Sequence, residues 1–391
     1  MLTPFLLAVA ASVAPGPAGT WRAALDLAGG PLRFSLEVRQ SRGALTGRLC
    51  NAGECESPFE IRAKGDSLIF DIADYAATIA VSVSGDSMTG MYRNVGSRGP
   101  RAIPFRAARG RWPIERAPAR LLGEWDATLT TDGRTSPRIF MFRNTPRGLE
   151  GAVVSNTGDY GKFWGRAHAD SFSMARFDGT FVYMVTGRLD GDTLRGIFHA
   201  GHRTQTPFVA VRSTGRPHLR EPTTVTAADT AAPFRFSFPA LDGGVVTNDD
   251  PRFRNKVVLI DVFGTWCSTC HETAPLFSRF YREYRNRGFE VVGFAYEVTG
   301  DTATDAVLVR RYRDKLRISF PLLLAGISDV AAAARTLPQL SNFTSFPTMI
   351  FLGRDGRVRR VHAGFYGAAT GAMHTAQVAE LRAFIERLLA E

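Results

Sequence analysis

The chain has 391 residues, of which 45% are hydrophobic, and its 48 basic and 37 acidic residues give a net charge of +11. This composition excludes a disordered polypeptide, because a chain of this length and apolar content can bury two or three separate cores. The positive charge is spread along the chain rather than gathered on one segment, so we expect no nucleic-acid partner.

Residues 1–18 are predicted to form a cleaved signal peptide. An apolar stretch, Phe5–Val13, is followed by small residues and prolines that end at Ala18. No lysine or arginine precedes the apolar stretch, so an uncleaved N-terminal membrane anchor is the alternative. No later segment approaches the ~18 apolar residues that a transmembrane helix needs. We therefore expect a periplasmic or secreted protein with no transmembrane segment beyond the signal peptide.

The following two hundred or so residues repeat themselves. Gly19-Thr20-Trp21 returns as Gly123-Glu124-Trp125, and each unit contains about eight short runs of alternating apolar and polar residues between Gly, Asp and Asn turns. This pattern predicts two antiparallel all-β units, residues 19–110 and 111–214, each a small barrel or sandwich. The Gly-x-Trp opening resembles that of lipocalin-type barrels. Barrels this small are usually filled by side chains, but ligand binding inside one stays open.

The first unit contains a cysteine pair that the second unit lacks. Cys50 and Cys55 flank a turn sequence, and we predict a structural disulfide between them, which fits an oxidising compartment. Val154 and Asp159 stand at the matching positions of the second unit, so the disulfide is not essential to the repeat. No metal site is predicted in the second unit, because its histidines lack a clear carboxylate or thiol companion; they are His168, His199 and His202.

Two segments are predicted to be linkers. The arginine-rich run Arg98–Arg120 contains Pro113 and Pro118 and joins the β units, so we interpret it as a solvated connection. Residues 215–232 are rich in Thr, Ala and Asp and have no periodicity, and they precede a last domain at 233–391.

The last domain alternates strand and helix patterns, which predicts an α/β fold. An unbroken apolar run at 257–263 is typical of a strand buried on both faces. The remaining elements are expected to be a hairpin at 234–246, helices at 268–287, 303–316, 328–336 and 375–390, and strands at 291–296, 319–324, 348–352 and 357–362.

Cys267-Ser-Thr-Cys270 stands where the buried strand meets the first helix. The spacing of three residues puts both sulfurs on one face of a helix, close enough to form a disulfide. Cys267 lies at the helix N-terminus, where unpaired N–H groups and the helix dipole favour its thiolate. Cys270 lies one turn further in and is suited to resolve a mixed disulfide. This predicts a redox-active disulfide that requires no other cofactor.

Two other readings of the motif stay open. A zinc site would need a second ligand pair, and the only other cysteines lie far upstream. With His271, the motif also matches the attachment pattern of c-type haem. Haem c would need a helical surround and an axial partner, whereas this motif follows a strand and a tryptophan.

The motifs of residues 233–391 resemble the TlpA-like thiol–disulfide oxidoreductases of the thioredoxin superfamily. The resemblance rests on four features in order, with an insertion at about 294–324 that is typical of TlpA-like members: Asp261, Trp266-Cys267-x-x-Cys270, Pro275 and Phe346-Pro347-Thr348. It implies that Cys267 attacks a substrate disulfide and that Cys270 releases the product. Asp261 is expected to exchange a proton with Cys270 through water. Pro347 is expected to be cis and to lie beside the sulfurs.

Three further residues are expected to contact substrate. The backbone of Phe346 would pair with it, and Trp266 would shield the rim of the site or, alternatively, serve as a buried anchor. Glu297 ends a strand at the edge where α/β proteins bind ligands and is also a candidate for tuning the cysteines. Together these features predict an exported enzyme that reduces or exchanges protein disulfides, with a membrane thiol-reductant protein as donor and the β units as a docking or binding module. The alternatives are a ligand- or partner-binding protein in which the β units carry the main role, and a peroxiredoxin-like peroxidase.

Overall fold

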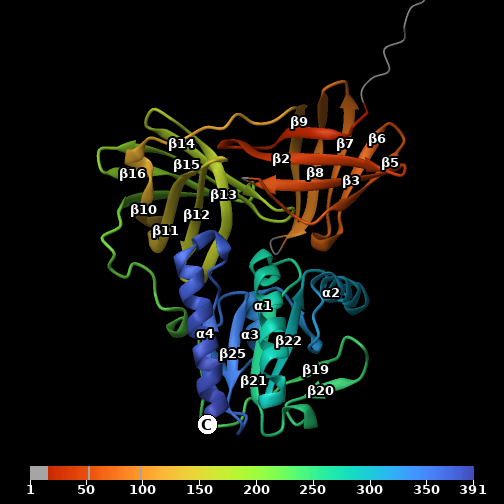
Figure 1. Cartoon of the computed structure of the whole chain (residues 1–391), viewed down its shortest axis with the longest axis vertical. Coiled ribbons are helices and arrows are strands. Elements are labelled where there is room, and N and C mark those ends of the chain that lie inside the picture. Colours follow the sequence, from red (N-terminus) through yellow and green to blue (C-terminus); the bar gives the residue numbers. More distant parts are fainter. Residues whose placement is uncertain (1–15, 52, 97–98) are drawn as a thin grey trace, which may run out of the picture.

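The computed structural model describes residues 16–51, 53–96 and 99–391 (Figure 1). The predicted signal peptide lies outside this range, except for residues 16–18. Two β units lie side by side, and the α/β domain lies below them with one end against both (Figure 1). Within the described ranges, no helix is both long enough and apolar enough to cross a membrane.

The first unit is an antiparallel sheet in the order β2-β1-β9-β8-β7-β6-β5-β3-β4. A further pairing between β2 and β3 closes this sheet into a barrel. Its strands are β1 Gly19–Leu27, β2 Gly30–Ser41, β3 Ala44–Asn51, β4 Glu54–Cys55, β5 Phe59–Lys64, β6 Ser67–Ile72, β7 Ala77–Ser84, β8 Ser87–Gly96 and β9 Gly99–Arg109.

The second unit is a closed antiparallel barrel in which each strand pairs with the next and the last pairs with the first. The prediction of two like all-β units is therefore confirmed. The strands are β10 Gly123–Thr131, β11 Arg134–Thr145, β12 Gly148–Ser155, β13 Gly158–His168, β14 Ser171–Phe177, β15 Val182–Asp190, β16 Thr193–Ala200 and β17 Thr204–Arg212.

The predicted linker Arg98–Arg120 was wrong in its first half. Strand β9 occupies Gly99–Arg109 and closes the first barrel against β1. Ile103, Phe105 and Ala107 point into the barrel and are buried, while the positions between them, Pro104 and Arg106, are exposed. The arginines concealed this alternation, because a strand with one solvated face has the same charge content as a loop.

The Gly-x-Trp motif has the same structural role in both barrels. Trp21 and Trp125 are buried, and each donates its indole N–H to the carbonyl four residues earlier, at 2.9 Å. An arginine of the last strand lies over each ring, with Arg109 at 4.4 Å from Trp21 and Arg212 at 4.2 Å from Trp125. Each motif therefore joins the first and last strands of its barrel through burial and a cation–π contact.

Side chains fill the interior of each barrel, as the size of the units predicted. The largest fully buried residues include Phe34, Phe70, Tyr92, Phe140 and Phe163. The turn between β14 and β15 also joins the two barrels. Phe177 packs 4.8 Å from Phe34 and 5.0 Å from Tyr92, and its backbone N–H and carbonyl both bond to the side chain of Asn51.

The structure pairs Cys50 with Cys55 in a disulfide across β3 and β4. Their counterparts Val154 and Asp159 face each other in the same way across β12 and β13. A crosslink that closes so short a loop constrains the unfolded chain by about 2 kcal/mol. We expect the double variant Cys50→Ser/Cys55→Ser to keep its fold and lose about 2 kcal/mol in unfolding free energy. Urea denaturation of the full chain measures this, and a loss of all β structure would contradict it.

The C-terminal domain contains a five-stranded sheet in the order β23-β22-β21-β25-β26. Strands β21, β22 and β23 are parallel, and β25 and β26 run antiparallel to their neighbours. Its elements are β18 Ala227–Ala228, β19 Ser237–Pro239, β20 Val245–Thr247, β21 Val257–Phe263, α1 Ser268–Tyr284, β22 Phe289–Glu297, α2 Thr302–Leu316, β23 Leu322–Ile327, α3 Val330–Thr336, β24 Leu340–Ser341, β25 Thr348–Leu352, β26 Val358–Ala363 and α4 Ala372–Ala390.

Strand β21 lies at the centre of this sheet, and its side chains contribute to the hydrophobic core on each face. Val257, Leu259 and Phe263 pack with α1, α2 and α4, whereas Val258 and Ile260 pack on the other face with α3 and the β19–β20 hairpin. A strand buried on both faces needs an apolar residue at nearly every position, which explains the unbroken run in the sequence.

Two of the boundaries that differ from the prediction have a clear physical reason. The end of the predicted linker 215–232 belongs to the domain, because β18 pairs with β24 and Thr226 donates its hydroxyl to the carbonyl of Asn342 at 3.1 Å. The predicted strand at 319–324 begins later, at Leu322. Pro321 precedes it and has no N–H to contribute to a strand ladder.

Candidate active site

The two cysteines lie where β21 leads into α1. Cys267 is the N-cap residue of α1, and its sulfur accepts the backbone N–H of Cys270 at 3.2 Å. The structure joins the two sulfurs in a disulfide. When this bond is reduced, the same N–H and the helix N-terminus stabilise negative charge on the Cys267 sulfur. The local geometry is therefore suited to a nucleophilic thiolate with a resolving partner one turn away.

Cys267 is more buried than its predicted role suggests. It is 3% exposed and Cys270 is 0% exposed. Both barrels contact the segment around the motif: the ring of Tyr75 lies 5.4 Å from His271, and the ring of Phe181 lies 6.4 Å from Trp266. The redox motif thus lies at the junction of the three units, as Figure 1 shows for the upper end of α1.

The turn between β12 and β13 packs on the loop after β26. The N–H of Asp159 bonds to the carbonyl of Phe365 at 3.2 Å, and its carboxylate accepts the N–H of Gly367 at 2.9 Å. A Cβ on Gly158 would overlap the carbonyl oxygen of Phe365, so the two backbones touch directly. The same loop is tied to the proline beside the site, because Gly364 donates its N–H to the carbonyl of Pro347 at 2.7 Å. The second barrel therefore covers backbone that adjoins the Pro347 loop.

Asp261 lies in the middle of β21 and is 1% exposed. Burial raises its pKa to about 8, and its Oδ1 has no hydrogen-bond partner among the described residues. A buried carboxyl without a counter-charge is mostly neutral at neutral pH, and only its carboxylate form, whose fraction grows as the pH approaches 8, can accept a proton from a nearby group.

Trp266, which directly precedes Cys267, packs against Phe346, which directly precedes Pro347. The Phe346–Pro347 peptide bond is cis, in agreement with the prediction. The rings of Trp266 and Phe346 meet edge to face at 5.4 Å, and the indole N–H of Trp266 donates to the carbonyl of Tyr296 at 2.8 Å. Trp266 is thus held by β22 on one side while its ring reaches toward Phe181 of the second barrel on the other.

Glu297 does not have the substrate-facing position that we predicted. It is 1% exposed, and its two oxygens accept the backbone N–H and the hydroxyl of Thr265, at 2.8 and 2.7 Å. Burial raises its pKa to about 8. The carboxyl at the end of β22 therefore holds the loop that precedes Trp266 and Cys267, and it acts on the site through that loop.

Sequence reasoning missed two residues beside the disulfide. His271 bonds through Nε2 to the carbonyl of Thr265 at 2.7 Å, and burial lowers its pKa to about 4, so the imidazole is neutral and donates this bond. Tyr312 of α2 donates its hydroxyl to the carbonyl of Cys270 at 2.7 Å. Both fix the first turn of α1. Tyr312 lies in the helix predicted at 303–316, and nothing in that local pattern pointed to the site.

Acidic side chains from three units meet near the start of α1. Burial raises the pKa of Glu56 to about 7, and burial together with Glu272 raises the pKa of Asp159 to about 6. Arg176 opposes both shifts and forms an ion pair with Asp178 at 3.2 Å. The interface between the barrels and the redox motif therefore contains both buried acids and a buried cation.

The residues of the alternative metal and haem readings are already engaged. Among the residues that the structure describes, the one group of side chains spaced for a metal ion is Glu37, Cys50 and Cys55, and its two sulfurs are bonded to each other. The atoms that would hold haem c are also occupied, because Cys267 and Cys270 form a disulfide and His271 Nε2 binds Thr265.

The C-terminal part of the chain is similar to proteins that are already known. Residues 226–370 match the Redoxin family. A thiol-disulfide oxidoreductase named ResA from Halalkalibacterium halodurans is 26% identical over 109 residues, which are 28% of this chain and 54% of that protein. The ResA protein of Bacillus subtilis is 22% identical over 111 residues, or 28% of this chain and 55% of its own length. The matches thus span about half the length of these curated relatives.

Solved structures align over the same part. A putative thiol:disulfide interchange protein DsbE from Chlorobium tepidum has a TM-score of 0.33 and 21% identity, and the alignment covers 42% of this chain and 99% of that one. From the family match and the ResA relatives, we conclude that the C-terminal part of this chain contains a Redoxin domain that is similar to the ResA thiol-disulfide oxidoreductases.

Proposed function

We propose that the chain is a thiol–disulfide oxidoreductase that reduces or exchanges disulfides in substrate proteins. The observation that carries this proposal is the Cys267–Cys270 pair at the N-terminus of α1, directly after a strand that contains a buried acid. No cofactor other than this disulfide is required for the chemistry. The Redoxin match and the names of the relatives support the same assignment.

The proposed reaction conserves two electrons. The Cys267 thiolate attacks one sulfur of a substrate disulfide, which forms a mixed disulfide and releases the other substrate sulfur as a thiolate. Cys270 then loses its proton toward Asp261 and attacks the Cys267 sulfur, which releases the second substrate thiolate and leaves the Cys267–Cys270 disulfide. A membrane thiol-reductant protein would return the pair to the reduced form.

Substrate contacts are assigned to Trp266 and Phe346, which pack against each other. Glu297 is assigned a positioning role, because both of its oxygens hold Thr265. We further propose that the two barrels dock substrates or partners at the redox motif, which both of them contact. Export to the periplasm or beyond remains part of the proposal and rests on the apolar stretch Phe5–Val13.

The test is capture of a mixed disulfide by single-cysteine variants of the full chain. Cys270→Ser leaves the attacking sulfur without its resolving partner, so we expect it to retain substrate proteins covalently. Cys267→Ser lacks the attacking sulfur and should retain few, and Cys50→Ser/Cys55→Ser with an intact motif serves as the control. Non-reducing gels followed by mass spectrometry measure the outcome. Equal retention by Cys267→Ser and Cys270→Ser would contradict the assigned roles.

The burial of Cys267 favours a second candidate, a binding protein whose barrels carry the main role. In that case neither variant retains a partner, although the barrels still bind one without a covalent bond. The peroxidase alternative predicts yet another result: Cys270→Ser would consume hydrogen peroxide at the wild-type rate and retain no protein.

A further inference from the structure

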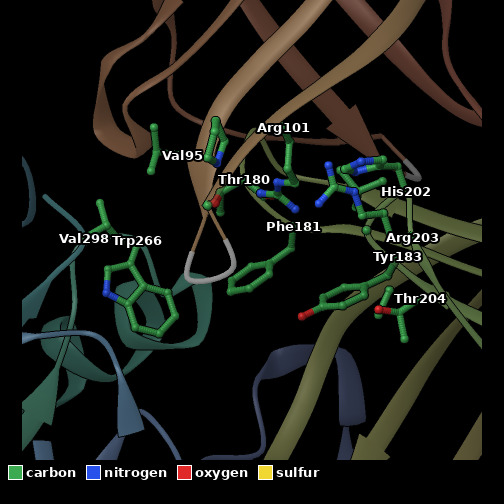
Figure 2. Close-up of a pocket in the computed structure, with 15 residues that line it drawn as sticks. Val95, Arg101, Thr180, Phe181, Tyr183, His202, Arg203, Thr204, Trp266 and Val298 are labelled. Atoms are coloured by element: carbon green, nitrogen blue, oxygen red, sulfur yellow. The ribbon is translucent and has the colours of Figure 1, made fainter. Parts of the chain in front are cut away.

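A pocket of about 340 Å³ lies where both barrels meet the Redoxin domain (Figure 2). Arg101 of β9 comes from the first barrel, and Trp266 comes from the loop before α1. The second barrel contributes Phe181 and Tyr183 at the start of β15 and His202 and Arg203 in the turn before β17. We call this cavity, defined by these six residues, the junction pocket.

The charged side chains of the junction pocket, Arg101 and Arg203, are both basic, and its histidine, His202, is mostly neutral at neutral pH. Arg101, His202 and Arg203 point toward one another in Figure 2, and none of the described residues that line the cavity is acidic. Within the described part of the chain, neither arginine forms an ion pair with a carboxylate; Arg101 is held instead by Asn94 Oδ1 and the carbonyl of Thr180, both at 2.7 Å. Burial lowers the pKa of His202, and the two arginines lower it further. Uncompensated cations in a cavity favour an anionic ligand.

The other wall of the pocket is aromatic and leads toward the nucleophile. Phe181 and Tyr183 stack with their ring centres 5.3 Å apart, and Phe181 meets Trp266 at 6.4 Å. Trp266 directly precedes Cys267, whereas Cys267 itself does not line the pocket. A ligand bound here must therefore extend past Trp266 before it can reach the sulfur. A flexible polypeptide can do so, but a small carboxylate cannot.

We propose that the junction pocket binds an acidic segment of the substrate polypeptide, with an aromatic or apolar side chain beside its carboxylates, next to the disulfide that Cys267 attacks. The inference rests on the proposed oxidoreductase function and names its substrate class. The arginines and the histidine bind the carboxylates, and the wall of Phe181, Tyr183 and Trp266 receives the apolar side chain. The pocket then holds the substrate while its disulfide approaches the motif.

The test uses two synthetic disulfide-bridged peptides of equal length and sequence except for the tail. One ends in Phe-Asp-Asp-Glu and the other in Phe-Asn-Asn-Gln. Their binding is first measured by fluorescence anisotropy with the full chain in which Cys267→Ser and Cys270→Ser remove the chemistry. We expect the acidic peptide to bind about tenfold more tightly at low ionic strength, with most of the difference lost in about 0.5 M salt. Equal affinities at low salt would overturn the proposal.

The binding site is assigned with the variant His202→Asn/Arg203→Gln, which spares the bonds of Arg101. It should weaken acidic-peptide binding about fivefold and leave the neutral peptide unchanged. Arg134→Gln, at an exposed arginine that begins β11 in the same barrel, is the matched control and should change neither value. If His202→Asn/Arg203→Gln and Arg134→Gln lose equal affinity for the acidic peptide, the peptide does not bind in the junction pocket. Succinate binding as tight as that of the acidic peptide would overturn the polypeptide assignment.

A second readout separates this inference from the proposed function. The fully reduced full chain is mixed with each peptide in single turnover, and the reduction rate is followed against peptide concentration. We expect the acidic peptide to reach half-saturation at about tenfold lower concentration with an unchanged maximal rate, since the pocket contributes binding and not chemistry. If the acidic preference in binding is present and neither peptide is reduced, the oxidoreductase assignment fails while the pocket stands. If both peptides are reduced with equal half-saturation, the pocket assignment fails instead.

Discussion

The variant Asp261→Asn is expected to release reduced substrate about 10²-fold more slowly than the wild type at neutral pH. Asp261 is buried on β21, and burial raises its pKa to about 8. Only its carboxylate form can accept the proton of Cys270, so the wild-type release rate should rise with pH, with its midpoint near pH 8, and level off above it. Asparagine cannot accept this proton. In this variant the release rate should therefore no longer rise with pH near pH 8. Rapid-quench kinetics of the reduced chain measure this pH dependence.

The same substitution is expected to stabilise the fold. The pKa of Asp261 is raised from 3.8 to about 8 in the folded chain, so its contribution to stability is greatest below pH 3.8 and is lost as the pH rises through the folded value. Asparagine does not titrate and avoids this loss. At pH 7 we expect Asp261→Asn to raise the free energy of unfolding by on the order of 2–4 kcal/mol.

Glu290→Gln provides the matched control. Glu290 lies on the neighbouring strand β22, is also buried, and has a pKa that burial raises, but it lies next to Lys256. Its replacement should leave the pH profile of substrate release unchanged. A slower release in Glu290→Gln equal to that in Asp261→Asn, or a release rate that still rises near pH 8 in Asp261→Asn, would show that Asp261 is not the proton acceptor.

The variant Gly158→Val is expected to expose Cys267 by displacing the second barrel from the Redoxin domain. A side chain at Gly158 would overlap the carbonyl of Phe365, and the backbone there has a φ of +105°, which disfavours a β-branched residue. Because Cys267 is only 3% exposed in the assembled chain, loss of this contact should speed its alkylation in the reduced chain. We expect about a tenfold increase, equivalent to a closed state weakened by about 1.4 kcal/mol.

Iodoacetamide labelling of the reduced chain, read by mass spectrometry at the Cys267 peptide, measures this effect separately from the other cysteines. Gly191→Val is the control, since Gly191 lies in a turn of the same barrel with a φ of +58°, and a Cβ added there would meet no atom within 4 Å. Gly191→Val should leave the labelling rate unchanged. If Gly158→Val labels no faster than the control, contact with the second barrel is not what protects Cys267.

The local parts of the site were predictable because their causes lie within a few residues of each other. Three-residue spacing places Cys267 and Cys270 on the same helix, and the apolar run before them requires a strand with two buried faces. The paired Gly-x-Trp motifs likewise predicted two barrels, because each motif recurs with its full set of alternating strands. In β9, by contrast, buried and exposed residues alternate as in any strand with one solvated face. The prediction gave more importance to the many arginines of this segment, and so it described the strand as a linker.

What only the tertiary structure decided depends on contacts between residues far apart in the chain. Glu297 could not be assigned its partner Thr265 until β22 was placed beside β21, because a carboxyl at a strand end can face either a ligand or a neighbouring loop. The contacts of Trp266 and His271, on either side of the cysteines, are with Phe181 and Tyr75, which belong to two other units far upstream in the chain. Sequence periodicity describes which face of an element is apolar, and the chemistry of this site follows from which faces of three separate units meet.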